Sequence, residues 1–297
     1  MKKATVILIK TILSIVVLGG AYWFVLPPIN LRSTEFYSFV IFAIIYLLLK
    51  NKSQKTIDIC GYVLGSISIF ILILRNVDIF IRNGWDLEVI PLQVCHIGST
   101  VVGLALLLKR KWLILTAFCF NLIPAFLAMV FADSLANYDT LFKIRPQTYV
   151  WGHIFIVVCA LYALLLYRNK FTKKDLYKAL IFVGIMSVIA IICNSLFRHL
   201  LAWESNYFYL FDYKGTPLKF LYQVFPSSKY GWFEINWFYT LTLMIVFVAV
   251  FILMYHLAKL IYGNLSRNKK IIMEFSPEDT EFVTNNRQQD CLEKAKE

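Results

Sequence analysis

The sequence predicts an all-α membrane protein, a polytopic bundle of about eight transmembrane helices, or seven if its shortest apolar segment does not cross. Of its 297 residues, 59% are hydrophobic and only 16% are charged, whereas a soluble domain is about 45–50% apolar and about 25% charged. The apolar residues gather into runs, and a run of about 20 spans the hydrocarbon core of a bilayer. Such segments are expected to be helical, because lipid offers no partner to backbone polar groups.

Eight apolar segments follow one another along the chain, at residues 4–26, 34–49, 57–81, 88–108, 112–132, 148–167, 177–200 and 235–262. We interpret the first as a retained anchor, because Pro27 and Pro28 follow it instead of a small-residue cleavage site. The segment 34–49 is short, and whether it spans the membrane stays open. In the fifth segment, Asn121 and Pro124 predict a kink. The expected domains are a membrane domain of residues 1–266 and a polar cytoplasmic tail of residues 267–297.

Basic residues in the connections predict the orientation. If the amino terminus is cytoplasmic, the cytoplasmic segments hold 16 basic residues and the outer connections hold seven. By the positive-inside rule, both termini then lie in the cytoplasm and the protein is a multipass protein of the cell membrane. The net charge of +12 is mostly explained by this topology, so no nucleic-acid partner is expected.

The motifs of several other protein classes are absent from the sequence. It has no Walker A loop and no G-x-G-x-x-G element, and its six cysteines show no paired spacing that would predict a disulfide framework. We expect no metal ion and no other cofactor.

Four of the predicted helices carry polar side chains at the same depth in the membrane. Because such groups cost free energy in lipid, each is a candidate for function. The fourth segment carries Cys95 and His96, the sixth His153, the third Arg75 and Asp78, and the seventh Asn194 and Arg198. The alternating topology places all of them in the outer third of the bilayer. The aromatic-rich outer loop 201–234 is expected either to lie on the membrane interface or to roof a cavity there.

A cysteine and a histidine at equal depth are the components of an activated thiolate. His153 would take the proton of the Cys95 thiol, and the thiolate would attack an ester or thioester carbonyl to form an acyl-enzyme. His96 projects about 100° further around its helix, so we expect it to bind or orient the substrate. Arg198 could hold a phosphate head group through its planar fork.

Two other classes of function stay open. In a transporter or lipid-binding protein, Arg198 would pair with an anionic group and His153 would be a proton-linked switch. In a structural membrane protein, the polar groups would only hold helices together, and a membrane cysteine commonly packs as a small apolar residue. We interpret Arg75 and Asp78, three residues apart on one helix face, as a structural ion pair.

Three short motifs resemble the YwaF-like family of bacterial multipass membrane proteins. They are Pro91-Leu-Gln-Val-Cys95, the helix-borne His153, and Asn206-Tyr207-Phe-Tyr-Leu210, followed by a proline-containing stretch that ends at Pro217. The resemblance covers roughly residues 60–255. It departs from the family at Gln93, where many bacterial members carry a histidine.

The resemblance implies a function and a set of site residues. Animal relatives of this family, the transmembrane protein 164 group, are cysteine acyltransferases that remodel phospholipid acyl chains. The resemblance implies that the chain is a lipid acyltransferase, with Cys95 and His153 as the expected catalytic residues and membrane lipids as the expected partners. The expected substrate-binding residues are His96, Asn194, Arg198, Asn206 and Tyr207.

Overall fold

The computed structural model describes residues 34–130, 143–167, 169–213, 219–224, 227–230 and 233–267. The long helices are α2 (Thr34–Leu49), α3 (Gln54–Asn83), α4 (Val94–Leu108), α7 (Ile144–Leu166), α8 (Lys173–Leu200) and α10 (Trp237–Arg267). Between α4 and α7 run α5 (Lys111–Thr116), the π-helix η2 (Ala117–Asn121) and α6 (Leu122–Val130). Before α10 lie the short elements η4 (Tyr207–Tyr209), α9 (Lys219–Tyr222), β1 (Ser228–Tyr230) and β2 (Phe233–Ile235). The predicted all-α membrane bundle is confirmed, with one small antiparallel hairpin of β1 and β2 added.

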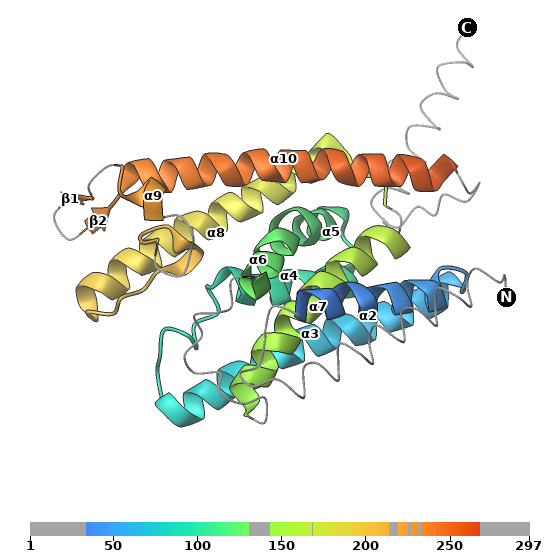
Figure 1. Cartoon of the computed structure of the whole chain (residues 1–297), viewed down its shortest axis with the longest axis horizontal. Coiled ribbons are helices and arrows are strands. Elements are labelled where there is room, and N and C mark those ends of the chain that lie inside the picture. The colour runs from blue at the N-terminus through green and yellow to red at the C-terminus, as the bar shows by residue number, and fades with distance from the viewer. Residues whose placement is uncertain are drawn as a thin grey trace, which may run out of the picture.

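The bundle is built around α7. This helix packs against α2, α3, α4 and α6, while α5 packs on α8 and η2 on α10. In Figure 1, α10 runs along the edge opposite to α2 and α3, and α4, α5 and α6 lie between them. Val102, Leu106, Val157 and Ala160 are among the fully buried side chains of this centre.

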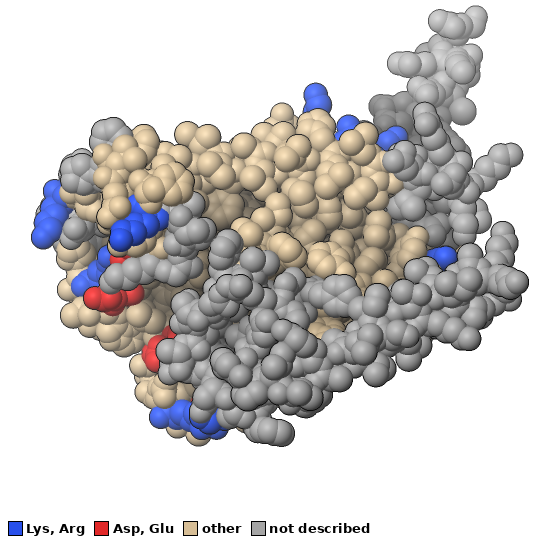
Figure 2. Space-filling view, in the orientation of Figure 1, with Lys and Arg blue, Asp and Glu red and all other residues tan. Residues whose placement is uncertain are grey.

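The outer helices carry apolar side chains on their surfaces. Phe70 of α3, Ile181 of α8, and Ile245 and Leu253 of α10 are all exposed, as expected for helix faces in contact with lipid. Among the described residues, five helical stretches are long and apolar enough to cross a membrane: Gln54–Asn83, Lys111–Ala128, Ile144–Leu166, Lys173–Leu200 and Trp237–Tyr262. The chain is therefore an integral membrane protein. On the face drawn in Figure 2, acidic side chains and a group of basic ones gather at the end that carries β1 and β2.

The structure refines the prediction at two segments, and two further predicted parts of the chain lie outside the described residues. The segment 88–108 is helical only from Val94, because Gly84, at a φ of 70°, ends α3 and Pro91 has no N–H to give to a helix. At the kink predicted from Asn121 and Pro124, the structure has the π-helical turn η2. The segment 4–26 and the tail from residue 268 onward lie outside the described residues.

Two glycines allow α3 and α4 to approach closely. A Cβ atom on Gly65 would lie 2.9 Å from the carbonyl oxygen of Gly103, and a Cβ atom on Gly103 would lie 2.6 Å from Cγ1 of Ile69. Next to this crossing, the Ser68 hydroxyl donates a hydrogen bond of 3.1 Å to the Ser99 carbonyl. The crossing fixes the start of α4 against the end of α3, where the polar residues of both helices lie.

We expect Gly65→Ala to lower the free energy of unfolding by about 1–2 kcal/mol, because the added methyl group meets backbone that cannot move aside. Thermal unfolding in detergent measures the change. Gly184→Ala on α8 is the matched control: its Cβ would meet no atom within 4 Å, and alanine favours a helix by up to about 1 kcal/mol over glycine. Equal stability of the Gly65→Ala variant and the parent would contradict the close crossing.

Candidate functional site

One cavity of about 530 Å³ gathers most of the polar residues predicted for the site. It lies at the end of the bundle where α3 and α8 end and where α4 and α7 begin. Its wall includes Cys95, His96, His153 and Arg198. The turn 84–93 and the loop 201–213 complete the wall. The loop 201–234 was expected either to lie on the membrane interface or to roof a cavity, and its described part 201–213 lines a cavity.

Cys95 is the second residue of α4, at the helix N terminus. Gln93, the residue before the helix, makes no side-chain hydrogen bond to the first turn. The N–H groups of that turn and the helix dipole therefore favour negative charge at this position, which is how helix N termini stabilise thiolates. The thiol is half-buried. Burial opposes formation of the thiolate, and the nearby guanidinium of Arg75 offsets part of this effect.

His153 lies on α7 and is buried, with one ring nitrogen fixed by its own helix. Its Nδ1 lies 2.8 Å from the carbonyl oxygen of Tyr149. Because a carbonyl only accepts, Nδ1 carries the proton, and Nε2 is the basic nitrogen of the neutral ring. The Tyr149 ring packs against the imidazole, with 4.3 Å between centroids, and the Tyr149 hydroxyl donates to the Ala128 carbonyl. The ring orientation is thus held from two sides.

His96 and Arg198 present polar atoms that have few protein partners. His96 is buried, and its Nδ1 has no hydrogen-bond partner among the described residues. Arg198 donates from Nε to the Ser205 carbonyl at 2.8 Å and lies over the Phe211 ring at 5.4 Å. These contacts orient the guanidinium, and within the described part of the chain its two terminal nitrogens have no partner.

The other three predicted binding residues support the wall of the cavity, and two of them line it. Asn194 lies behind it: its side-chain amide accepts from the Tyr207 N–H at 2.7 Å and donates to the Tyr207 carbonyl at 3.0 Å. Asn206 lines the cavity, but its side chain bonds the backbone of Phe211 and Asp212. Tyr207 also lines it, and its hydroxyl donates to the Leu87 carbonyl at 2.9 Å. Their polar atoms hold the loop 201–213 in place.

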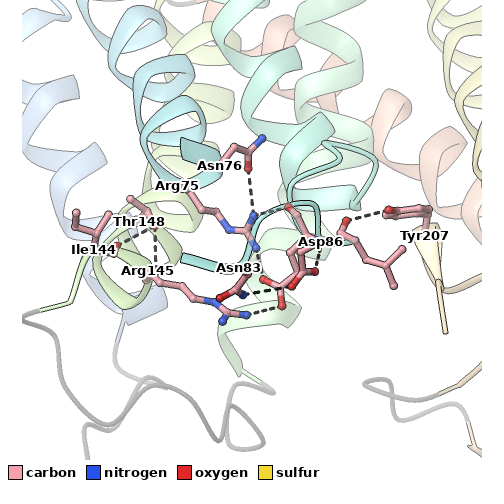
Figure 3. A network of polar contacts seen from close by, with 10 residues as sticks. Arg75, Asn76, Asn83, Asp86, Ile144, Arg145, Thr148 and Tyr207 are labelled. Carbon is pink, nitrogen blue, oxygen red and sulfur yellow. Dashed lines mark hydrogen bonds and ion pairs between the residues drawn. The ribbon is translucent and has the colours of Figure 1, made fainter. Parts of the chain in front are cut away.

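An ion-pair network closes one side of the cavity. Arg75 pairs with Glu88 at 2.7 Å and also donates to the Glu88 carbonyl at 2.9 Å. Arg145, at the start of α7, pairs with the other oxygen of the same carboxylate. Figure 3 shows Arg75 and Arg145 pointing toward the turn between α3 and α4, which Tyr207 meets from another side.

The predicted pair of Arg75 with Asp78 is wrong. Asp78 instead pairs with Arg82, one turn further along α3, at 2.8 Å. The turn 84–93 brings the Glu88 carboxylate back to Arg75. The same carboxylate also pairs with Arg145, so Glu88 is the partner that Arg75 uses in place of Asp78.

Several residues that line the cavity were not among the predicted ones, and two of them matter most here. Glu88 bridges two arginines, and Tyr209 lines the cavity. The signal for Glu88 was a carboxylate inside a predicted apolar segment, just before Pro91. Tyr209 had no comparable signal, because it was one of many aromatic residues in the loop.

The fold and the site define a multipass membrane protein with a polar cavity at one end of its helix bundle. A family model described as the TMEM164 family matches residues 3–255, and the chain belongs to this family. Searches of curated proteins and of solved structures give no significant match.

Proposed function

We propose that this protein is a lipid acyltransferase in which Cys95 is the nucleophile and His153 the general base. The observation that supports this most directly is that both side chains line the same cavity. The thiol lies at a helix N terminus, and the tautomer of His153 leaves its basic Nε2 without a partner among the described residues. We assign the chain to the bacterial YwaF-like branch of its family on the Pro91–Cys95 and Asn206–Leu210 motifs.

The proposed reaction has two steps with balanced protons. In the first, Nε2 of His153 takes the proton of the Cys95 thiol, Sγ bonds to the carbonyl carbon of a donor lipid ester, and the ester C–O bond breaks. The imidazolium returns the proton to the departing alkoxide, leaving a thioester on Cys95 and a lysolipid. In the second step, the hydroxyl of an acceptor lipid gives its proton to His153 and attacks the thioester. The C–S bond breaks, and the imidazolium returns the proton to the departing Cys95 thiolate. The reaction needs neither a redox partner nor a metal ion.

Arg198 and His96 fit the binding of a phospholipid in this cavity. The free edge of the Arg198 guanidinium can donate two hydrogen bonds to one phosphate. The Nδ1 of His96 is a second polar partner for the glycerol region. A cavity of about 530 Å³ falls within the range of small-ligand sites, about 300–1,000 Å³. It would hold the polar part of the lipid while the acyl chains stay in the bilayer.

The orientation favours a phospholipid over an acyl thioester as donor. Lys109, Arg110 and Lys111 lie at the other end of α4 from the cavity. If these basic residues are cytoplasmic, the cavity faces the outer leaflet of the cell membrane. Soluble acyl thioesters are made in the cytoplasm, whereas phospholipids are present on both sides.

The test is to trap the acyl-enzyme. We expect the purified protein, incubated with a phospholipid whose acyl chain ends in an alkyne, to carry a hydroxylamine-sensitive label that peptide mass spectrometry places on Cys95. Cys193, a half-buried thiol on α8, is the internal control and should stay unlabelled. Absence of a thioester, or a label on a different cysteine, would overturn the proposed function.

A further inference from the structure

The loop 201–213 holds Tyr209 in an unusual backbone conformation. Phe208 and Tyr209 have φ values of 60° and 56°, in the left-handed region where residues other than glycine are strained. Such strain persists only where the surroundings impose it, and it is found most often at functional sites. The left-handed backbone at Tyr209 therefore marks this part of the loop as a candidate functional element.

The surroundings of Tyr209 are firmly anchored. Phe208 is buried and stacks on Phe120 of η2, with 5.7 Å between ring centroids. The Leu210 carbonyl accepts a hydrogen bond of 2.8 Å from the Thr240 hydroxyl of α10. These contacts on either side of Tyr209 fix the direction in which its side chain leaves the backbone.

The Tyr209 side chain lines the cavity that holds Cys95 and His153. It is 38% exposed, whereas its neighbours Tyr207 and Phe208 are buried. The Tyr207 hydroxyl has a backbone partner, but within the described residues the Tyr209 hydroxyl makes no hydrogen bond. A strained loop thus presents a phenol with an unused donor to the space beside the thiol.

The hydroxyl is a hydrogen-bond donor at neutral pH. Burial, followed by the electrostatic effect of a charged Cys95, raises the pKa of Tyr209 to about 12. The effect of Cys95 also means that negative charge near the thiol disfavours the phenolate. The proton therefore stays on Tyr209 throughout a reaction at the Cys95 sulfur.

We propose that the Tyr209 hydroxyl is a catalytic hydrogen-bond donor that binds the oxyanion formed at the substrate carbonyl. This proposal rests on the proposed acyl transfer. When Sγ of Cys95 bonds to the carbonyl carbon, the π electrons of the C=O bond move to its oxygen, which then accepts hydrogen bonds from Tyr209 and from the N–H groups of the first turn of α4. When the intermediate collapses, the C=O bond forms again, the ester C–O bond breaks, and Tyr209 keeps its proton.

The test compares two reactions of the same thiol in Tyr209→Phe, which removes only the hydroxyl. Acylation of Cys95 by the alkyne phospholipid passes through an oxyanion, whereas alkylation of Cys95 by iodoacetamide does not. Loss of one oxyanion donor lowers the rate of the chemical step by about 10²–10³-fold, so we expect single-turnover acylation to fall by that factor and alkylation to stay within about twofold of the parent. Tyr213→Phe, in the same loop but outside the cavity wall, is the control and should retain both rates.

The outcomes separate this proposal from the proposed function. Unchanged acylation in Tyr209→Phe, with a thioester still on Cys95, would overturn the role of Tyr209 and leave the acyltransferase intact. Equal losses of acylation and alkylation would show that Tyr209 only shapes the loop, which also overturns it. Acylation that persists in Cys95→Ala would defeat the proposed function and this inference together.

Discussion

Acyl transfer by a Cys95→Ala variant is expected to fall to background, by about 10⁴-fold or more. Alanine differs from cysteine by the thiol group alone and leaves the start of α4 unchanged. The substitution therefore removes the atom that forms the thioester. His153→Gln is expected to lower the rate by about 10²–10⁴-fold, the usual contribution of a general acid–base, since an amide cannot accept the thiol proton. Both rates are measured as transfer of an alkyne-bearing acyl chain from phospholipid to lysophospholipid in vesicles.

A double variant tests whether the thiol and the imidazole act together. If Cys95 and His153 act as one unit, Cys95→Ala combined with His153→Gln is no slower than Cys95→Ala alone, because the base has nothing left to activate. Cys193→Ala is the matched control, a half-buried cysteine on α8 that lies outside the cavity wall, and it should retain the parental rate. Lipid transport that survives Cys95→Ala but fails in Arg198→Ala, with no acyl transfer by the parent protein, would favour a transporter over an enzyme.

Helices and their common polar depth could be predicted from the sequence because both depend on local pattern. The segment 34–49 coincides with α2, and α7 and α8 each begin four residues before their predicted segments. The alternation of the spans placed Cys95, His153 and Arg198 near one end of the bundle, and all three line one cavity. Helical periodicity and hydropathy predict the depth of these residues even when it is not known which helices contact one another.

Pairings that depend on tertiary contacts could not be predicted in the same way. Arg75 has Asp78 on its own helix face, but the partner that it uses lies beyond the end of α3 in a turn whose path is set by Gly84 and Pro91. The left-handed backbone at Tyr209 is likewise imposed by contacts with η2 and α10. Sequence pattern predicts which face of a helix is buried. These features arise instead in a turn and a loop that contact several helices.

The carboxylate of Glu88 is expected to stabilise the protein more than the Asp78–Arg82 ion pair does. It is shared by Arg75 and Arg145, whose side chains are only 12% and 26% exposed. Removing its charge leaves two half-buried guanidinium groups facing each other. Breaking a fully buried pair by removal of one partner costs about 3–5 kcal/mol, and Glu88 itself is 35% exposed. We therefore expect Glu88→Gln to lower the free energy of unfolding by about 2–3 kcal/mol.

Thermal unfolding in detergent, followed by circular dichroism, measures this effect against three further variants: Arg82→Gln, Arg145→Gln, and Glu88→Gln combined with Arg145→Gln. Arg82→Gln breaks the pair with Asp78, in which the arginine is 59% exposed, and should cost no more than about 1 kcal/mol. Adding Arg145→Gln to Glu88→Gln removes one of the two facing cations, so the double variant should be more stable than the sum of the single changes predicts. If Glu88→Gln costs no more than Arg82→Gln, or if the two changes simply add, the shared carboxylate does not hold the start of α7 to the end of α3. The cavity would then owe its shape to the loop 201–213 and the glycine crossing alone.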